Sequence, residues 1–245
     1  MDAEELRRRR AAQERRRRKK KKRTVQLIRR AAVILVVAAL FCGVSSLIGR
    51  LRQERSEKQE LDKIFSRTVG DAPGFEVQLL TPNSYSRPQK KLGKVKGIVV
   101  HYTANPGTTA QQNRDYFEGL KDSKTTYASS HFIIGIDGEI IQCIPSSEIA
   151  YASNERNEDT LSIECCHKDE TGEFSRETYD SLVHLVAWMC GKFDLTTRDI
   201  IRHYDVTGKK CPLYYVEHQD AWEQFLVDVE TYIKEHGKEA EPKLS

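Results

Sequence analysis

The stretch "HFIIGIDGEIIQCIP", residues 131–145, carries the clearest fold signal in the chain. Two short apolar runs flank Asp137-Gly138, and an Asp-Gly pair between apolar runs is a strong hairpin signal. The stretch therefore predicts two antiparallel strands joined by a tight turn.

Three further strands are expected around this hairpin. "GIVVHYT" (97–103) and "LSIECCH" (161–167) are rich in β-branched or apolar residues, and "DIIRHY" (199–204) is a shorter segment of the same kind. His101 and His203 are expected at the ends of the first and last of these strands.

Helices are expected between the strands. After a turn at Pro106-Gly107, Thr108 and Gln111 fit a capping box. Residues 176–193 have apolar side chains at helical spacing. A C-terminal helix is marked by Trp222, Phe225, Leu226, Val229 and Ile233. The order of elements predicts one α/β domain with a mixed sheet flanked by helices, at residues 75–236, followed by a disordered tail at 237–245.

The N-terminal part has a different composition. Residues 1–30 carry 15 Lys and Arg against 4 Asp and Glu, and residues 31–49 carry no charged side chain. As a helix, 19 residues span roughly 28 Å, close to the thickness of a bilayer's hydrocarbon core. We expect a basic cytoplasmic tail at 1–30, one transmembrane anchor at 31–49, and a stalk and linker at 50–74.

The positive-inside rule then places the C-terminal domain outside the cell membrane, on the cell-wall side. A cleaved signal peptide is the alternative interpretation of residues 31–49. The basic run is interpreted as a topology signal that contacts anionic lipid, in preference to nucleic acid binding. The chain is expected to be monomeric and to bind no nucleic acid.

Six cysteines raise the question of disulfide bonds. Cys42 lies in the apolar segment, and four others lie in apolar periodic stretches where a small buried side chain is the common role. Cys211 alone follows a polar loop. No disulfide framework is expected.

Five residues are placed where chemistry can use them. Two histidines and one thiolate, here His101, His203 and Cys211, can hold zinc and leave a fourth position for water. Glu164, in an otherwise apolar strand, can accept a proton, and Lys209 can stabilise an oxyanion. Each residue type also has common structural roles, and the His–Cys spacing matches no general zinc rule. The pattern alone leaves a metal hydrolase and a purely structural interpretation open.

Four blocks extend the argument to a known family: "IVVHYTANPGTTAQQNRDYF", "SSHFIIGIDGEIIQCIP", "LSIECCHKDETGEF" and "RHYDVTGKKCP". In order and spacing they closely resemble the type-2 N-acetylmuramoyl-L-alanine amidases, zinc enzymes related to phage lysozyme-type amidases and peptidoglycan recognition proteins. The resemblance covers most of residues 80–235.

The resemblance implies hydrolysis of the amide between the lactyl group of muramic acid and L-alanine in peptidoglycan. Carried over by position, the zinc ligands fall on His101, His203 and Cys211. The catalytic glutamate of many bacterial members falls on Glu164, and the family's lysine falls on Lys209.

Two positions depart from relatives. Ser130 stands where phage lysozyme-type members often carry a catalytic tyrosine, and Ala152 stands where many relatives carry a groove histidine. A substrate role stays open for His131 and His167. His184, with Asp180 one turn earlier, is expected on a solvated helix face.

The remaining histidines, His218 and His236, are expected at the surface. Three alternative functions stay open. The domain can be a non-catalytic peptidoglycan-binding module of the same fold, a different zinc amidohydrolase, or a degenerate domain on a basic membrane-surface or nucleic-acid-binding factor.

Overall fold

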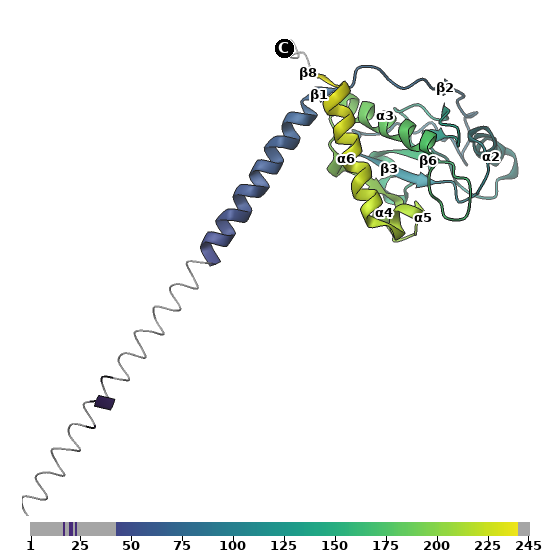
Figure 1. Cartoon of the computed structure of the whole chain (residues 1–245). Helices are drawn as coiled ribbons and strands as arrows, with labels where there is room; N and C mark the ends of the chain where they lie inside the picture. Colours follow the sequence, from purple (N-terminus) through teal and green to yellow (C-terminus); the bar gives the residue numbers. More distant parts are fainter. Residues whose placement is uncertain (1–16, 18–19, 22, 24–42, 240–245) are drawn as a thin grey trace, which may run out of the picture. The chain divides into compact units, whose positions relative to one another are not determined.

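Figure 1 shows a computed structural model of the chain, which describes residues 17, 20, 21, 23 and 43–239. The chain divides into two compact units, residues 1–59 and 60–245. Within the first unit, residues 43–59 are helical. The second unit contains all the strands named below and the candidate site.

The main sheet has six strands in the order β2-β5-β4-β6-β3-β7. They are β2 (Glu76–Val77), β3 (Gly97–Tyr102), β4 (Phe132–Ile134), β5 (Ile140–Gln142), β6 (Thr160–Cys165) and β7 (Ile200–Arg202). Strands β4 and β5 pair antiparallel, whereas β3 pairs parallel with both β6 and β7. The predicted hairpin and the mixed sheet are confirmed.

Helices cover both faces of this sheet. Helix α2 (Ala110–Ser123) packs on one face, where Phe117 meets Ile133 and Ile141 in a small core. Helices α3 (Arg176–Phe193) and α6 (Gln219–His236) pack together on the other face, in a larger core (Figure 1). Cys165 and Cys166 lie in different cores, as strand alternation requires.

Short helical turns connect these elements. They are η1 (Asn154–Glu158), η2 (Thr197–Asp199), α4 (His203–Thr207) and α5 (Leu213–Glu217). Helix α3 has the predicted bounds. The capping box of α2 lies one residue later than predicted: Thr109, not Thr108, is the N-cap, and it exchanges hydrogen bonds with Gln112. Thr108 instead donates to the carbonyl oxygen of Asn105, within the preceding turn.

The hairpin is fastened to helix α3 through its turn. Thr178 Oγ1 donates to the Gly135 carbonyl oxygen and Ser181 Oγ to that of Gly138, each at 2.7 Å. Gly138 has φ +84°, a conformation that L side chains rarely adopt, and a Cβ there would lie 2.8 Å from the Glu177 carbonyl oxygen. The Asp-Gly signal in the sequence therefore reflects both backbone conformation and close packing.

The second unit extends beyond residues 75–236 at both ends. Ile64 and Val69 are buried in the larger core. Strand β1 (Arg67–Thr68) pairs antiparallel with β8 (Lys238–Glu239), and Arg67 Nε donates to the Gly237 carbonyl oxygen. Residues 238 and 239, expected in a disordered tail, are thus paired. The rest of that tail, residues 240–245, lies outside the described residues.

The basic tail and most of the expected anchor also lie outside the described residues. Residues 43–49, the end of the apolar segment, are helical and exposed. In the parts of the chain that are described, no helix has both the length and the apolar character needed to cross a membrane.

Candidate metal centre

Three parallel strands bring the predicted site residues to one edge of the sheet. His101 on β3 is paired in register with Glu164 on β6, and Val100 with Arg202 on β7. Because parallel strands end at the same edge, the residue after Arg202 emerges beside His101. That residue is His203.

His203 begins helix α4 rather than ending a strand, which corrects the sequence prediction. The strand stops because Asp205 caps the helix: its Oδ2 accepts the Arg202 backbone N–H at 2.8 Å. The Arg202 guanidinium also binds Asp205 and donates to the Tyr215 carbonyl oxygen. These contacts fix the start of α4, and with it the position of His203.

The chain then turns back towards β3. Helix α4 ends at Thr207, and the next residue, Gly208, has a φ of +76° that allows the reversal. The Tyr204 backbone N–H donates to the Cys211 carbonyl oxygen at 2.9 Å. This short loop brings Cys211 back beside His203, eight residues earlier in the sequence, so that both side chains lie in the same group.

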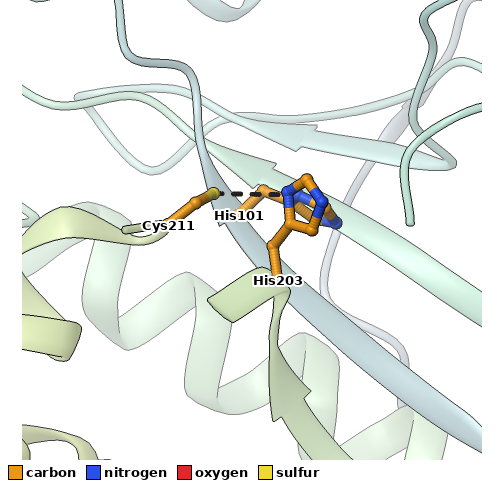
Figure 2. Close-up of side chains that lie close together, drawn as sticks. All are labelled: His101, His203 and Cys211. Atoms are coloured by element: carbon orange, nitrogen blue, oxygen red, sulfur yellow. Dashed lines mark hydrogen bonds between the residues drawn. The ribbon is translucent and has the colours of Figure 1, made fainter. Parts of the chain in front are cut away.

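His101, His203 and Cys211 form a compact group, shown in Figure 2. One donor atom from each lies within 4.8 Å of the others, and Cys211 Sγ is 3.8 Å from His101 Nδ1. The two imidazole rings are 4.6 Å apart between centroids. His101 and Cys211 are each only 2% exposed. The three predicted ligands therefore come together at a buried position.

A second layer of polar residues orients the histidines. Ser153 Oγ lies 3.1 Å from His101 Nε2, which leaves Nδ1 facing Cys211. Asn154 Oδ1 lies 3.4 Å from His203 Nε2. Such partners commonly fix the orientation of metal-binding histidines.

Ser153 and Asn154 were not predicted as site residues from the sequence, where only Ala152 stands out in this segment. The side chain of Asn157 accepts hydrogen bonds from the backbone N–H groups of Ala152 and Ser153, at 3.0 and 2.6 Å. No local pattern in "ASNERN" (152–157) indicates that two of its residues contact the distant histidines.

Both histidines are suited to act as neutral ligands. Burial, then the nearby His203 and Lys209, hold the pKa of His101 well below its usual value. Burial and Lys209 also lower the pKa of His203. The lowered pKa values favour the neutral form of each ring, in which one nitrogen carries a proton and the other is free to bind a cation.

The donor set fits zinc. Two imidazoles and one cysteine leave one of zinc's four positions open, as in catalytic sites. Burial, with the nearby Glu164 carboxylate, raises the pKa of the Cys211 thiol to about 12. A bound cation reverses this preference, because a metal-coordinating thiol loses its proton. Within residues 43–239 all five cysteines are free, as expected.

Glu164 stands beside this group. Its side chain is partly exposed as a whole, but Oε2 is buried and finds no hydrogen-bond partner among the described residues. Burial raises the pKa of Glu164 to about 8, against the opposing effect of Lys209. A buried carboxyl with a raised pKa and an unsatisfied oxygen is typical of a catalytic acid or base.

Lys209 lies in the loop between the last two ligands. Its side chain is exposed, and it forms no ion pair within the described part of the chain. Its charge nevertheless acts on His101, His203 and Glu164, whose pKa values it lowers. The ammonium is thus close enough to the group to influence it and is free to meet a ligand.

The residues of the hairpin block are structural. Ser130 is fully buried and donates to the Phe132 carbonyl oxygen. His131 is buried, with Nδ1 bound to Ser162 and Nε2 2.9 Å from the Glu148 carbonyl oxygen. Both ring nitrogens of His131 are therefore occupied, which leaves none for substrate.

The other histidines are not members of the metal group, although the Nε2 of His167 is buried and finds no hydrogen-bond partner among the described residues. His167 is buried, and its Nδ1 bonds to the Asp169 carbonyl oxygen. His184 contacts the Asp71 carbonyl oxygen, while Asp180, its expected helical neighbour, pairs with Arg176. Two more, His218 and His236, are exposed as predicted.

The model of the N-acetylmuramoyl-L-alanine amidase family matches residues 91–213, half of the chain. The chain belongs to this family. The matched residues contain all three metal-group members together with Glu164 and Lys209, so the family match and the geometry fall on the same part of the domain.

Two curated amidases illustrate the relationship. The chain is 35% identical over 164 residues to N-acetylmuramoyl-L-alanine amidase CwlL of Bacillus licheniformis, covering 62% of this chain and 45% of that protein. It is 35% identical over 173 residues to N-acetylmuramoyl-L-alanine amidase BlyA of Bacillus subtilis (strain 168), with the same two coverages. The chain spans less than half the length of these curated relatives.

Solved structures show the same fold. PlyL superposes with a TM-score of 0.56 at 22% identity, covering 64% of this chain and 97% of that one. The catalytic domain of XlyA gives a TM-score of 0.55 at 22% identity, covering 64% of this chain and 99% of that one. The amidase-family fold is therefore a property of this domain.

Proposed function

We propose that this chain is a zinc-dependent N-acetylmuramoyl-L-alanine amidase. Its substrate is peptidoglycan, and the bond hydrolysed is the amide between the lactyl group of muramic acid and L-alanine. The observation that carries the proposal is the buried His101–His203–Cys211 group with an unsatisfied Glu164 carboxyl beside it, all within the family match.

His101, His203 and Cys211 would hold the zinc ion. When bound, zinc supplies a Lewis acid for the scissile carbonyl and lowers the pKa of water. Ser153 and Asn154 keep the two imidazoles in position through their hydrogen bonds. Because His101, His203 and Cys211 are buried, bulk water is kept away from their ligand atoms.

Glu164 acts as the proton carrier. Its carboxylate takes a proton from the attacking water and later gives it to the nitrogen of the leaving L-alanine, so the proton is conserved through the reaction. A pKa raised by burial suits a group that must both accept and donate near neutral pH. Lys209 places a positive charge where the carbonyl oxygen becomes negative.

The test is amide cleavage of purified cell wall by the full chain. We expect new L-alanine amino termini, loss of activity with EDTA, and recovery when zinc is restored. Cleavage that survives both EDTA and Glu164→Ala contradicts the mechanism. Cell-wall binding without any cleavage supports the alternative, a non-catalytic binding module of the same fold.

We further propose that residues 31–49 anchor the chain as a single-pass, monomeric membrane protein with the amidase domain on the cell-wall side. The proposal is supported by the uncharged run and the basic residues before it. Protease added to intact cells should digest the domain. Protection of the domain until the cells are broken contradicts this topology.

A further inference from the structure

A surface groove lies along the segment that leads, two residues after Tyr151, to the His101 contact of Ser153. It has a volume of about 560 Å³, within the usual range for ligand sites. One wall is the loop of residues 82–90, and the other contains Tyr127 and Tyr151. None of the residues that line this groove takes part in the mechanism described above.

Two tyrosines, Tyr127 and Tyr151, line the groove, and a third, Tyr85, supports Tyr127 from outside the lining. Tyr85 and Tyr127 stack with centroids 5.0 Å apart and planes 19° apart, and Tyr127 meets Tyr151 edge-on at 5.6 Å. Tyr127 remains 61% exposed. An exposed ring held by two other rings offers a rigid apolar surface with a polar hydroxyl at its tip.

The loop wall is preorganised by its own hydrogen bonds. Asn83 Oδ1 accepts from the backbone N–H groups of Tyr85 and Ser86, at 2.7 and 2.9 Å. Arg87 forms two hydrogen bonds with Glu148, at 2.9 and 2.8 Å, which fasten the loop to the domain. A preformed wall costs little ordering entropy when a ligand binds.

The opposite wall is continuous with the metal centre. Ser129 and Tyr151 exchange hydrogen bonds of 3.0 and 2.9 Å, which hold the tyrosine segment in place. Two residues after Tyr151, Ser153 contacts His101. Two residues of chain span at most about 7 Å, so this wall of the groove belongs to the same short segment that contacts the metal group.

The charges in the groove favour a ligand with little net charge. The Arg87 guanidinium is paired with Glu148, and Lys90 is the remaining cation among the lining residues, all of which are described. Gln89 and the tyrosine hydroxyls add neutral hydrogen-bonding groups. Amino sugars match this lining, because a sugar ring has an apolar face for stacking and hydroxyl and acetamido groups at its rim. A stem peptide, with several carboxylates, needs more unpaired cations.

We propose that this tyrosine groove binds the glycan strand of peptidoglycan next to the amide that is hydrolysed. The inference rests on the proposed function, which supplies the polymer, and adds the part of the polymer that the domain recognises outside the reacting bond. Tyr127 is the central contact.

The test is equilibrium binding of a soluble tetramer of N-acetylglucosamine to the full chain, measured calorimetrically. Tyr127→Ala should weaken binding about tenfold, and Tyr127→Phe should retain most of it because the ring remains. The matched control is Tyr116→Ala, since Tyr116 on α2 is similarly exposed at 55% and lies outside the groove. It should leave the affinity unchanged.

Three results overturn the inference: the wild-type chain does not bind the tetramer, Tyr127→Ala binds it as tightly as wild type, or a sugar-free stem peptide displaces it. Binding needs no turnover, so the same titration in Glu164→Gln separates the two proposals. Tyr127-dependent binding without amide cleavage removes the proposed enzyme and keeps the glycan groove. Amide cleavage together with binding that does not depend on Tyr127 keeps the proposed enzyme and removes the glycan groove.

Discussion

His101 and Glu164 occupy the same register position on adjacent parallel strands, β3 and β6. The backbone ladder, rather than a flexible loop, therefore sets the separation between a metal ligand and the proposed proton carrier. Rigid strands position catalytic groups more accurately than loops do. The other two members of the metal group come from the first residue of helix α4 and from the loop that follows it. Their positions depend on the contacts of Arg202 that fix the start of α4.

Replacing Glu164 should separate metal binding from catalysis. Glu164→Gln keeps the shape of the side chain but removes its ability to carry a proton, so amidase activity should fall about 10²- to 10⁴-fold. Zinc content should stay at the wild-type value, because Glu164 is not a ligand. The control is Glu235→Gln, an exposed carboxylate on α6, which should retain full activity. A parallel loss of zinc and activity in Glu164→Gln argues against the assigned role.

The same substitution should stabilise the metal-free protein at neutral pH. A carboxyl whose pKa is raised to about 8 in the folded state binds more protons folded than unfolded. The contribution of Glu164 to the stability of the wild type must then fall as pH rises from about 4.5 towards 8. Glu164→Gln should be more stable by about 1 to 3 kcal/mol at pH 8, after allowance for partial exposure.

The difference between the two proteins should close as pH falls to about 4.5. Urea unfolding in EDTA at several pH values provides the measurement. If the wild type is as stable as Glu164→Gln at pH 8, or more stable, ionising the buried Glu164 carboxyl does not destabilise the folded protein.

Cys211→Ser should release the metal. Serine is a poor ligand at neutral pH, and even partners outside the first layer are worth about 10- to 100-fold in metal affinity, so zinc affinity should fall by more than tenfold. Zinc per chain after dialysis reports the loss. Cys190→Ser offers a control that is matched for burial, because Cys190 lies in the core on α3, away from the metal group. Equal zinc content in both variants rules out Cys211 as a ligand.

The hairpin turn should not tolerate a side chain. Gly138→Ala puts a side chain on a left-handed backbone and too close to helix α3. It should lower the free energy of unfolding by about 1 to 3 kcal/mol. Gly119→Ala is the matched control, since Gly119 lies inside helix α2 with open space around it. There, alanine should stabilise by about 0.5 to 1 kcal/mol. Denaturant unfolding of the two variants compares them directly, and equal effects contradict the account of the turn.

Local patterns in the sequence were sufficient for much of the fold. The Asp137-Gly138 turn and the helical spacing of residues 176–193 are short-range signals, and both elements form as expected. His203 was placed at a strand end because its apolar lead looks like a strand. The capping carboxylate of Asp205, two residues later, ends the strand and starts a helix instead.

The three metal ligands could be predicted from residue chemistry together with the family resemblance. The residues that hydrogen-bond to the two histidine ligands could not. Ser153 and Asn154 lie about 50 residues from the histidines that they contact, and nothing in their local pattern indicates that proximity. The pairing of β1 with β8 depends similarly on contacts across the chain. Long-range contacts between small polar residues leave little trace in a single sequence.

We propose that this chain uses a His101–His203–Cys211 zinc site to cut the lactyl–L-alanine amide. The decisive experiment is mass spectrometry of peptidoglycan digested by the full chain, with zinc content determined on the same sample. We predict one zinc per chain and two product classes: peptide-free glycan whose muramic acid residues carry free lactyl carboxylates, and stem peptides with a free L-alanine amino terminus. Zinc-loaded protein that leaves every peptide attached to its muramic acid would contradict the claim.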